Sequence, residues 1–200
     1  MKTTFYFLLS FLLISTFSWA NNTAQIMKAE SAPQIDGVKD ALWSTATAVD
    51  FGEMTNAGDG EPSVSATWKA LWDNDNLYLL FEVEDDVAIN NGAGNAVWYM
   101  HDCIEVFTDM QHAKSAAAVT NSNGEYQLRF IYGLDDEPIN ENPEMTSYES
   151  VSKLTDNGYV IEVKFPWSYL IANTDVTTAE GLKFGMDFKV TDIDEPTEGW

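Results

Sequence analysis

Apolar and polar residues alternate over short stretches of this chain, and clusters of turn-forming residues separate these stretches. Residues 103–108 show the pattern well, because Ile104 and Val106 alternate with Glu105. Such alternation is typical of a β-strand with one buried face. A helical period of 3.6 residues nowhere persists beyond about two turns. The pattern therefore predicts a protein made mostly of strands.

Two predicted hairpins give the strands their arrangement. One spans residues 67–84 around Asn74-Asp75-Asn76, and the other spans 148–165 around Asp156-Asn157-Gly158. Asn, Asp and Gly tolerate the left-handed backbone that tight turns need. We expect an all-β fold of about eight antiparallel strands, packed as a two-sheet sandwich of the jelly-roll or immunoglobulin-like kind. The other predicted strands are 103–108, 126–132 and 184–190.

Two short segments break the strand pattern and predict helical turns. Residues 40–45 follow Asp36-Gly37, and residues 166–170 begin with a proline, which is well tolerated at a helix start. Most of the tryptophans lie in apolar strand or turn contexts, so we expect them in the core. These core tryptophans are Trp43, Trp68, Trp72 and Trp167.

Residues 1–20 have the features of a secretory signal peptide. Lys2 precedes an apolar run over residues 5–17, and the small residue Ala20 marks the expected cleavage site. This run is shorter than a spanning helix requires, and no later run is as long, so we expect no membrane span. The prediction is a secreted or periplasmic protein with one domain over residues 21–200.

Composition narrows the functional class. The chain of 200 residues has 32 acidic and 10 basic side chains, a formal net charge of −22. Nucleic-acid contacts depend on clustered Lys and Arg, so nucleic acid is excluded as a partner. An aromatic content of 13% is too high for a disordered acidic tail. Cys103 is the only cysteine, so we expect it to be a buried apolar residue without a disulfide partner.

Several motifs, taken in order, resemble carbohydrate-binding module family 9 over residues 32–194. They are Ile35-Asp36-Gly37 with Asp40 and Trp43, Trp72-Asp73 with Asn76-Leu77-Tyr78, Trp98 with Asp102 to Phe107 and Asp109, Gln127-Leu128-Arg129, and Gly158-Tyr159 with Glu162. The resemblance implies a β-sandwich that binds neutral cellulose- or xylan-type saccharides, including their reducing ends. It also implies a module that is not itself an enzyme but is attached to, or secreted with, a glycoside hydrolase.

The resemblance assigns candidate binding residues. Family members stack a sugar ring between two tryptophans, which implies Trp98 as the first, with Tyr99 as a rival. Glu105, Arg129 and Gln127 match the groups that bond sugar hydroxyls. Apart from the resemblance, the alternation of side chains along the strands allows Glu105 and Arg129 to meet on one sheet face. Such a pair can bind a ligand, or it can be an ordinary cross-strand salt bridge.

Two departures from the family pattern bear on that site. Ile131 stands where family members have an asparagine, so hydroxyl specificity is expected to differ. The second tryptophan belongs beyond residues 191–194, close to where the sequence ends at Trp200. We therefore expect the domain to be incomplete at its C-terminus.

Carboxylates gather in turns, where solvated surface is the usual explanation. The resemblance also implies structural calcium, for which Asp85, Asp192 and Asp194 are the candidates, with no organic cofactor. Glycoside hydrolysis is disfavoured because Arg129 beside Glu105 lowers a carboxyl pKa, the wrong direction for a general acid. The overall charge favours neutral over acidic glycans.

Two other functions remain open at this point. The first is a haem-binding domain of the kind found in extracellular sugar dehydrogenases, with His112 and Met100 as axial ligands. Met100 and His101 are adjacent on an expected strand and point to opposite faces, so they cannot both bind one iron without a bulge. The second is a scaffold that serves only packing or partner contact.

Overall fold

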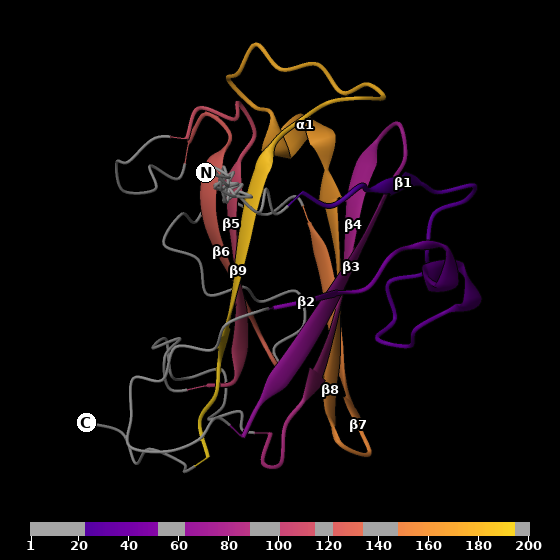
Figure 1. Ribbon diagram of the computed structural model, residues 1–200, viewed down its shortest axis with the longest axis vertical. Coiled ribbons are helices and arrows are strands. Elements are labelled where there is room, and N and C mark those ends of the chain that lie inside the picture. Colours follow the sequence, from indigo (N-terminus) through magenta and orange to yellow (C-terminus); the bar gives the residue numbers. More distant parts are fainter. Residues whose placement is uncertain (1–22, 52–62, 89–100, 115–121, 134–147, 195–200) are drawn as a thin grey trace, which may run out of the picture.

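The computed structural model describes residues 23–51, 63–88, 101–114, 122–133 and 148–194, and these form two β-sheets packed face to face (Figure 1). The six-stranded sheet has the order β1-β3-β4-β8-β7, with β2 also paired to β3. The three-stranded sheet has the order β6-β5-β9. The strands are β1 (Met27–Lys28), β2 (Val49–Asp50), β3 (Ser65–Trp72), β4 (Asn76–Glu84), β5 (Cys103–Asp109), β6 (Glu125–Ile131), β7 (Glu149–Thr155), β8 (Gly158–Pro166) and β9 (Gly185–Thr191). The predicted all-β sandwich is confirmed.

Both predicted hairpins are present, as β3–β4 and β7–β8. In the first turn the Asp73 carboxylate accepts hydrogen bonds from the backbone N–H groups of Asp75 and Asn76, at 2.8 and 2.7 Å. In the second, Gly158 has φ of +141°, and an added Cβ would lie 2.2 Å from the Val83 carbonyl oxygen. Only glycine fits that position, which explains the turn sequence.

Two short strands were not predicted. β1 and β2 have two residues each, too few for a period of two to be visible. β1 also pairs in parallel with β3, whereas we expected antiparallel pairing throughout. Both predicted helical turns are present, as the 3-10 helix η1 (Ala41–Thr45) and the short helix α1 (Trp167–Leu170).

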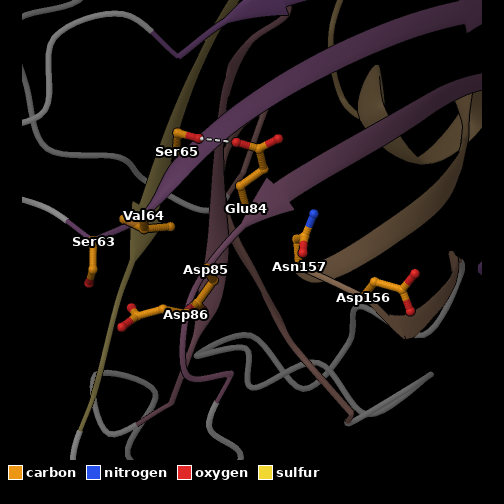
Figure 2. A pocket seen from close by; sticks show the side chains of 8 residues that line it. All are labelled: Ser63, Val64, Ser65, Glu84, Asp85, Asp86, Asp156 and Asn157. Atoms are coloured by element: carbon orange, nitrogen blue, oxygen red, sulfur yellow. Dashed lines mark hydrogen bonds between the residues drawn. The ribbon is translucent and has the colours of Figure 1, made fainter.

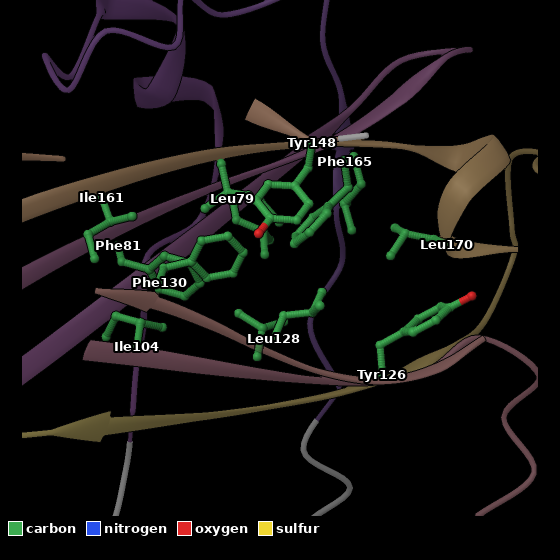
Figure 3. Close-up of a cluster of buried hydrophobic side chains, with 14 of the residues drawn as sticks. Leu79, Phe81, Ile104, Tyr126, Leu128, Phe130, Tyr148, Ile161, Phe165 and Leu170 are labelled. Atoms are coloured by element: carbon green, nitrogen blue, oxygen red, sulfur yellow. The ribbon is translucent and has the colours of Figure 1, made fainter. Parts of the chain in front are cut away.

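The main core lies between the two sheets (Figure 3). Aromatic rings meet edge to face there, as Phe130 does with Phe165 at 5.8 Å between ring centroids. Trp167 is buried, while Trp68 and Trp72 are partly buried and pack against this core. The labelled core residues in Figure 3 are Leu79, Phe81, Ile104, Tyr126, Leu128, Phe130, Tyr148, Ile161, Phe165 and Leu170.

A second core lies on the other face of the six-stranded sheet. There the segment that contains η1 covers β3, β4 and β8, on the side away from the three-stranded sheet (Figure 1). Trp43 is completely buried in this core, as predicted. Its members are Trp43, Ala46, Leu71, Tyr78, Leu80 and Val160.

Glu162 is a carboxylate buried beneath this segment. Its Oε2 accepts hydrogen bonds from the backbone N–H groups of Asp36 and Gly37, at 3.0 and 2.8 Å, and its Oε1 accepts one from Trp43 Nε1 at 2.9 Å. Burial raises the pKa of Glu162, and these three donors offset part of that shift. The carboxylate therefore fastens the N-terminal segment to the sheet.

Cys103 is fully buried at the start of β5, and burial raises the pKa of its thiol to about 12, which confirms the predicted apolar role. Four predicted features lie outside the described residues: the signal peptide, Trp98 and Tyr99, Met100, and the end of the chain at Trp200. Among the described residues, no helix is both long and apolar enough to cross a membrane.

Candidate functional site

A row of charged side chains lies on the face of the three-stranded sheet that points away from the main core. Ile104 and Val106 point into the main core, so Glu105 between them points outward on β5. Its register partner on β6 is Arg129, and its register partner on β9 is Lys189. A carboxylate is thus placed between two cations on adjacent strands.

Both oxygens of Glu105 are engaged. Oε2 accepts hydrogen bonds from Gln127 Nε2 at 2.7 Å and from Arg129 Nε at 3.2 Å, and Oε1 accepts one from Lys189 Nζ at 2.8 Å. The predicted contact of Glu105 with Arg129 is confirmed, and Gln127 joins it. Lys189 was missed, because the sequence does not reveal that β9 pairs with β5. We call Glu105, Gln127, Arg129 and Lys189 the polar cluster.

The carboxylate of the polar cluster stays ionised at neutral pH. Burial by itself raises the pKa of Glu105, but the hydrogen bonds from Lys189, Gln127 and Arg129 outweigh burial and hold the pKa below its usual value. A general acid needs a raised pKa, so this carboxylate is unsuited to protonating a leaving group. It is suited to accepting hydrogen bonds while its neighbours donate them.

A second set of carboxylates gathers where strands of both sheets end. β4 is followed by Asp85 and Asp86, β5 is preceded by Asp102, and β9 is followed by Asp192 and Asp194. Carboxylate oxygens of Asp85, Asp102 and Asp192 lie within 4.8 Å of one another, as do those of Asp85, Asp86 and Asp194. We call these five residues the aspartate cluster; Asp86 and Asp102 were not among the predicted metal ligands.

Two carboxylates of the aspartate cluster have raised pKa values. Burial raises the pKa of Asp85, although the Val87 N–H opposes this, and the charges of Asp194 and Asp86 raise it further. Burial also raises the pKa of Asp192. Within the described part of the chain, Asp85 Oδ2 and Asp192 Oδ1 are buried and accept no hydrogen bond. Buried carboxylate oxygens without a donor fit a hard cation such as calcium, which prefers oxygen ligands.

A pocket of about 520 Å³ lies beside the aspartate cluster (Figure 2). Its wall is strongly acidic, and none of the described residues that line it is aromatic. A sugar ring needs an apolar plane to stack on, so this pocket is a poor carbohydrate site. The lining residues are Ser63, Val64, Ser65, Glu84, Asp85, Asp86, Asp156 and Asn157.

The haem alternative expects His112 with Met100 as ligands, and the two histidines of the chain lie near opposite ends of β5. His101 is buried just before β5, whereas His112 is exposed just beyond its other end. β5 has seven residues, so roughly 20 Å of strand separates them. One iron therefore cannot be bound by both histidines, and Met100, the expected partner of His112, lies outside the described residues.

Residues 35–199 match the family model described as carbohydrate family 9 binding domain-like. Because this match covers most of the chain, the protein belongs to carbohydrate-binding module family 9. Members are non-catalytic carbohydrate-binding modules, so the prediction that this domain is not itself an enzyme is confirmed. Family membership gives the haem alternative no support.

Similar curated proteins are much longer enzymes. The chain is 29% identical over 163 residues to exoglucanase XynX of Acetivibrio thermocellus, which covers 82% of this chain. It is 28% identical over 176 residues to endo-1,4-beta-xylanase A of Thermoanaerobacterium saccharolyticum, which covers 88% of this chain. In both comparisons the match spans only 14% of the enzyme.

Solved structures of the family share the fold. A carbohydrate-binding module of family 9 from Caldicellulosiruptor kristjanssonii, solved in complex with glucose, matches with a TM-score of 0.64 at 22% identity, over 84% of this chain and 78% of that one. The same kind of module from this organism, solved in complex with cellotriose, matches equally well over 84% and 77% of the two chains. A putative carbohydrate-binding protein from Bacteroides uniformis matches with a TM-score of 0.56 at 12% identity, over 82% and 81%.

Proposed function

We propose that the outer face of β6, β5 and β9 binds a neutral oligosaccharide of the cellulose or xylan type, with preference for its reducing end. The observation that carries the proposal is the polar cluster, in which Glu105 lies between donors from two neighbouring strands. The relatives support it, because two are named as a xylanase and an exoglucanase and two were solved with glucose or cellotriose.

The polar cluster has the chemistry that a sugar rim requires. A hydroxyl both donates and accepts, so adjacent hydroxyls on a ring are matched by a carboxylate beside a guanidinium and an amide. Trp98 would supply the apolar plane for the ring, with Tyr99 as the alternative. Each of these roles is part of the proposal.

The biological setting follows from the same reasoning. We propose a secreted or periplasmic module, released by cleavage near Ala20, that directs a linked or co-secreted glycoside hydrolase to neutral polysaccharide. The signal-like segment over residues 1–20 and the enzyme relatives support this setting. Binding would raise the concentration of the enzyme at its substrate rather than take part in bond cleavage.

Titration calorimetry tests the binding proposal. Cellobiose and xylobiose are compared with their reduced alditols, and we expect reduction to weaken binding if the reducing-end ring is recognised. Arg129→Met should weaken binding at least tenfold, about 1.4 kcal/mol, because a charge-assisted donor is lost. Thermal unfolding of the same variant shows whether it is folded.

Lys164→Met is the matched control for Arg129→Met. Lys164 pairs with Glu149 at 2.7 Å on the six-stranded sheet, away from the polar cluster. Its removal should leave carbohydrate affinity unchanged. The proposal fails if the unmodified protein binds none of the disaccharides, or if folded Arg129→Met binds as well as the control.

The aspartate cluster would hold a structural calcium ion. Its residues come from the end of β4 in one sheet and from the ends of β5 and β9 in the other. A divalent cation there would offset the charge of the buried carboxylates and tie the two sheets together. Asp85, Asp86, Asp102, Asp192 and Asp194 are the proposed ligands, and no organic cofactor is part of the proposal.

A further inference from the structure

The members of the polar cluster differ sharply in their exposure to solvent. The side chains of Glu105 and Arg129 are 1% and 5% exposed, whereas the side chain of Lys189 is 53% exposed. A ligand that arrives from solvent therefore meets the side chain of Lys189 more readily than the buried pair of Glu105 and Arg129. The exposed edge of the cluster lies on β9.

The Lys189 ammonium is also held in place. Its register position opposite Glu105 and its 2.8 Å contact with Glu105 Oε1 fix a side chain that is usually flexible. The contact helps to offset the burial of the Glu105 carboxylate, yet it leaves the Lys189 side chain half exposed. The arrangement therefore presents an anchored donor to solvent beside the binding groups.

We propose that Lys189 contacts the bound sugar directly and selects for a hydroxyl on the solvent side of the ring. This inference rests on the proposed carbohydrate-binding function. An ammonium group donates three hydrogen bonds and accepts none, so it favours a ligand that offers an oxygen lone pair at that point. A ligand with hydrogen in place of that hydroxyl gains nothing from Lys189.

The rival explanation is that Lys189 acts only through Glu105. Its ammonium is the hydrogen-bond donor to Glu105 Oε1 and contributes to the lowered pKa of that carboxyl. In that case, loss of Lys189 would raise the pKa of Glu105 and harm binding only at acid pH. At pH 8 the carboxylate would be ionised with or without Lys189, so binding there separates the two explanations.

Calorimetry of Lys189→Met provides the test, since methionine keeps an unbranched stem and removes every donor. The ligands are glucose and its 1-, 2-, 3- and 6-deoxy analogues, each titrated at pH 5 and pH 8. We expect glucose to bind five- to tenfold more weakly to the variant at both pH values. For one deoxy analogue, the variant and the unmodified protein should bind equally.

Several results would overturn the inference. A loss confined to pH 5 would make Lys189 a positioning residue for Glu105, and an equal loss for every analogue would exclude a specific hydroxyl contact. No loss at all, in a variant that unfolds at the same temperature as Lys164→Met, would also reject it. If the unmodified protein binds no sugar, the proposed function fails together with this inference. If Arg129→Met weakens binding and Lys189→Met does not, only this inference fails.

Discussion

Replacing Glu162 with alanine should lower the free energy of unfolding by about 3 to 5 kcal/mol, because three hydrogen-bond donors lose a charged acceptor in a buried site. Those donors are the N–H groups of Asp36 and Gly37 and the indole of Trp43. Urea denaturation measures the change directly. Glu162→Gln keeps the side-chain volume and one acceptor oxygen, so we expect a smaller loss.

Glu82→Ala is the control for this substitution. Glu82 also lies on a strand of the six-stranded sheet, but its carboxylate pairs with Lys39 at the surface, at 2.7 Å. Loss of that pair should cost no more than about 1 kcal/mol. Equal destabilisation by Glu162→Ala and Glu82→Ala would show that the buried carboxylate does not fasten the N-terminal segment.

Adding calcium should raise the unfolding temperature by roughly 5 to 10 °C at a free concentration a hundred times the dissociation constant. Binding at that ratio stabilises the folded state by about 2.7 kcal/mol, and in a domain of this size each kcal/mol shifts the unfolding temperature by about 2 to 4 °C. Differential scanning calorimetry with and without a chelator measures the shift.

The calcium effect should depend on pH in a defined direction. The pKa values of Asp85 and Asp192 are raised in the folded protein, so without metal the folded state binds protons more readily than the unfolded chain. Their contribution to stability is therefore greatest below the unfolded pKa and is lost as the pH rises through the folded values. Calcium binds the ionised forms, so its stabilising effect should grow over the same pH range.

Two aspartate substitutions test whether calcium binds at the aspartate cluster rather than at other acidic groups on this surface. Asp85→Asn should remove most of the calcium-dependent shift, because Asp85 belongs to both ligand groups. Asp156→Asn should leave the shift intact, since Asp156 lines the neighbouring pocket but is outside the aspartate cluster. A calcium shift that survives Asp85→Asn would place the ion elsewhere.

The strands and hairpins could be predicted because their signals are local. A period of two marks β5, and Asn157-Gly158 marks a tight turn whatever surrounds it. Side-chain parity was enough to place Glu105 and Arg129 on the same face. β1 and β2 could not be predicted, because their two-residue pairings with β3 are set by tertiary contacts.

The complete site could not be predicted because it depends on which strands become neighbours. Lys189 joins Glu105 only because β9 returns to pair with β5, far away in the sequence. Asp102 joins Asp85 and Asp192 only because strand ends from two sheets meet. Glu162 is part of the family motif, so its presence was noted in the sequence. Its burial could not be predicted, because it depends on the N-terminal segment that packs over β8.

A crystal structure of the protein with cellotriose tests the central claim most directly. We expect the sugar on the outer face of β6, β5 and β9, with at least one hydroxyl about 3 Å from a polar atom of Arg129, Gln127 or Lys189. Sugar bound in the acidic pocket beside Asp156, or on the six-stranded sheet, with the polar cluster out of contact, would contradict the claim.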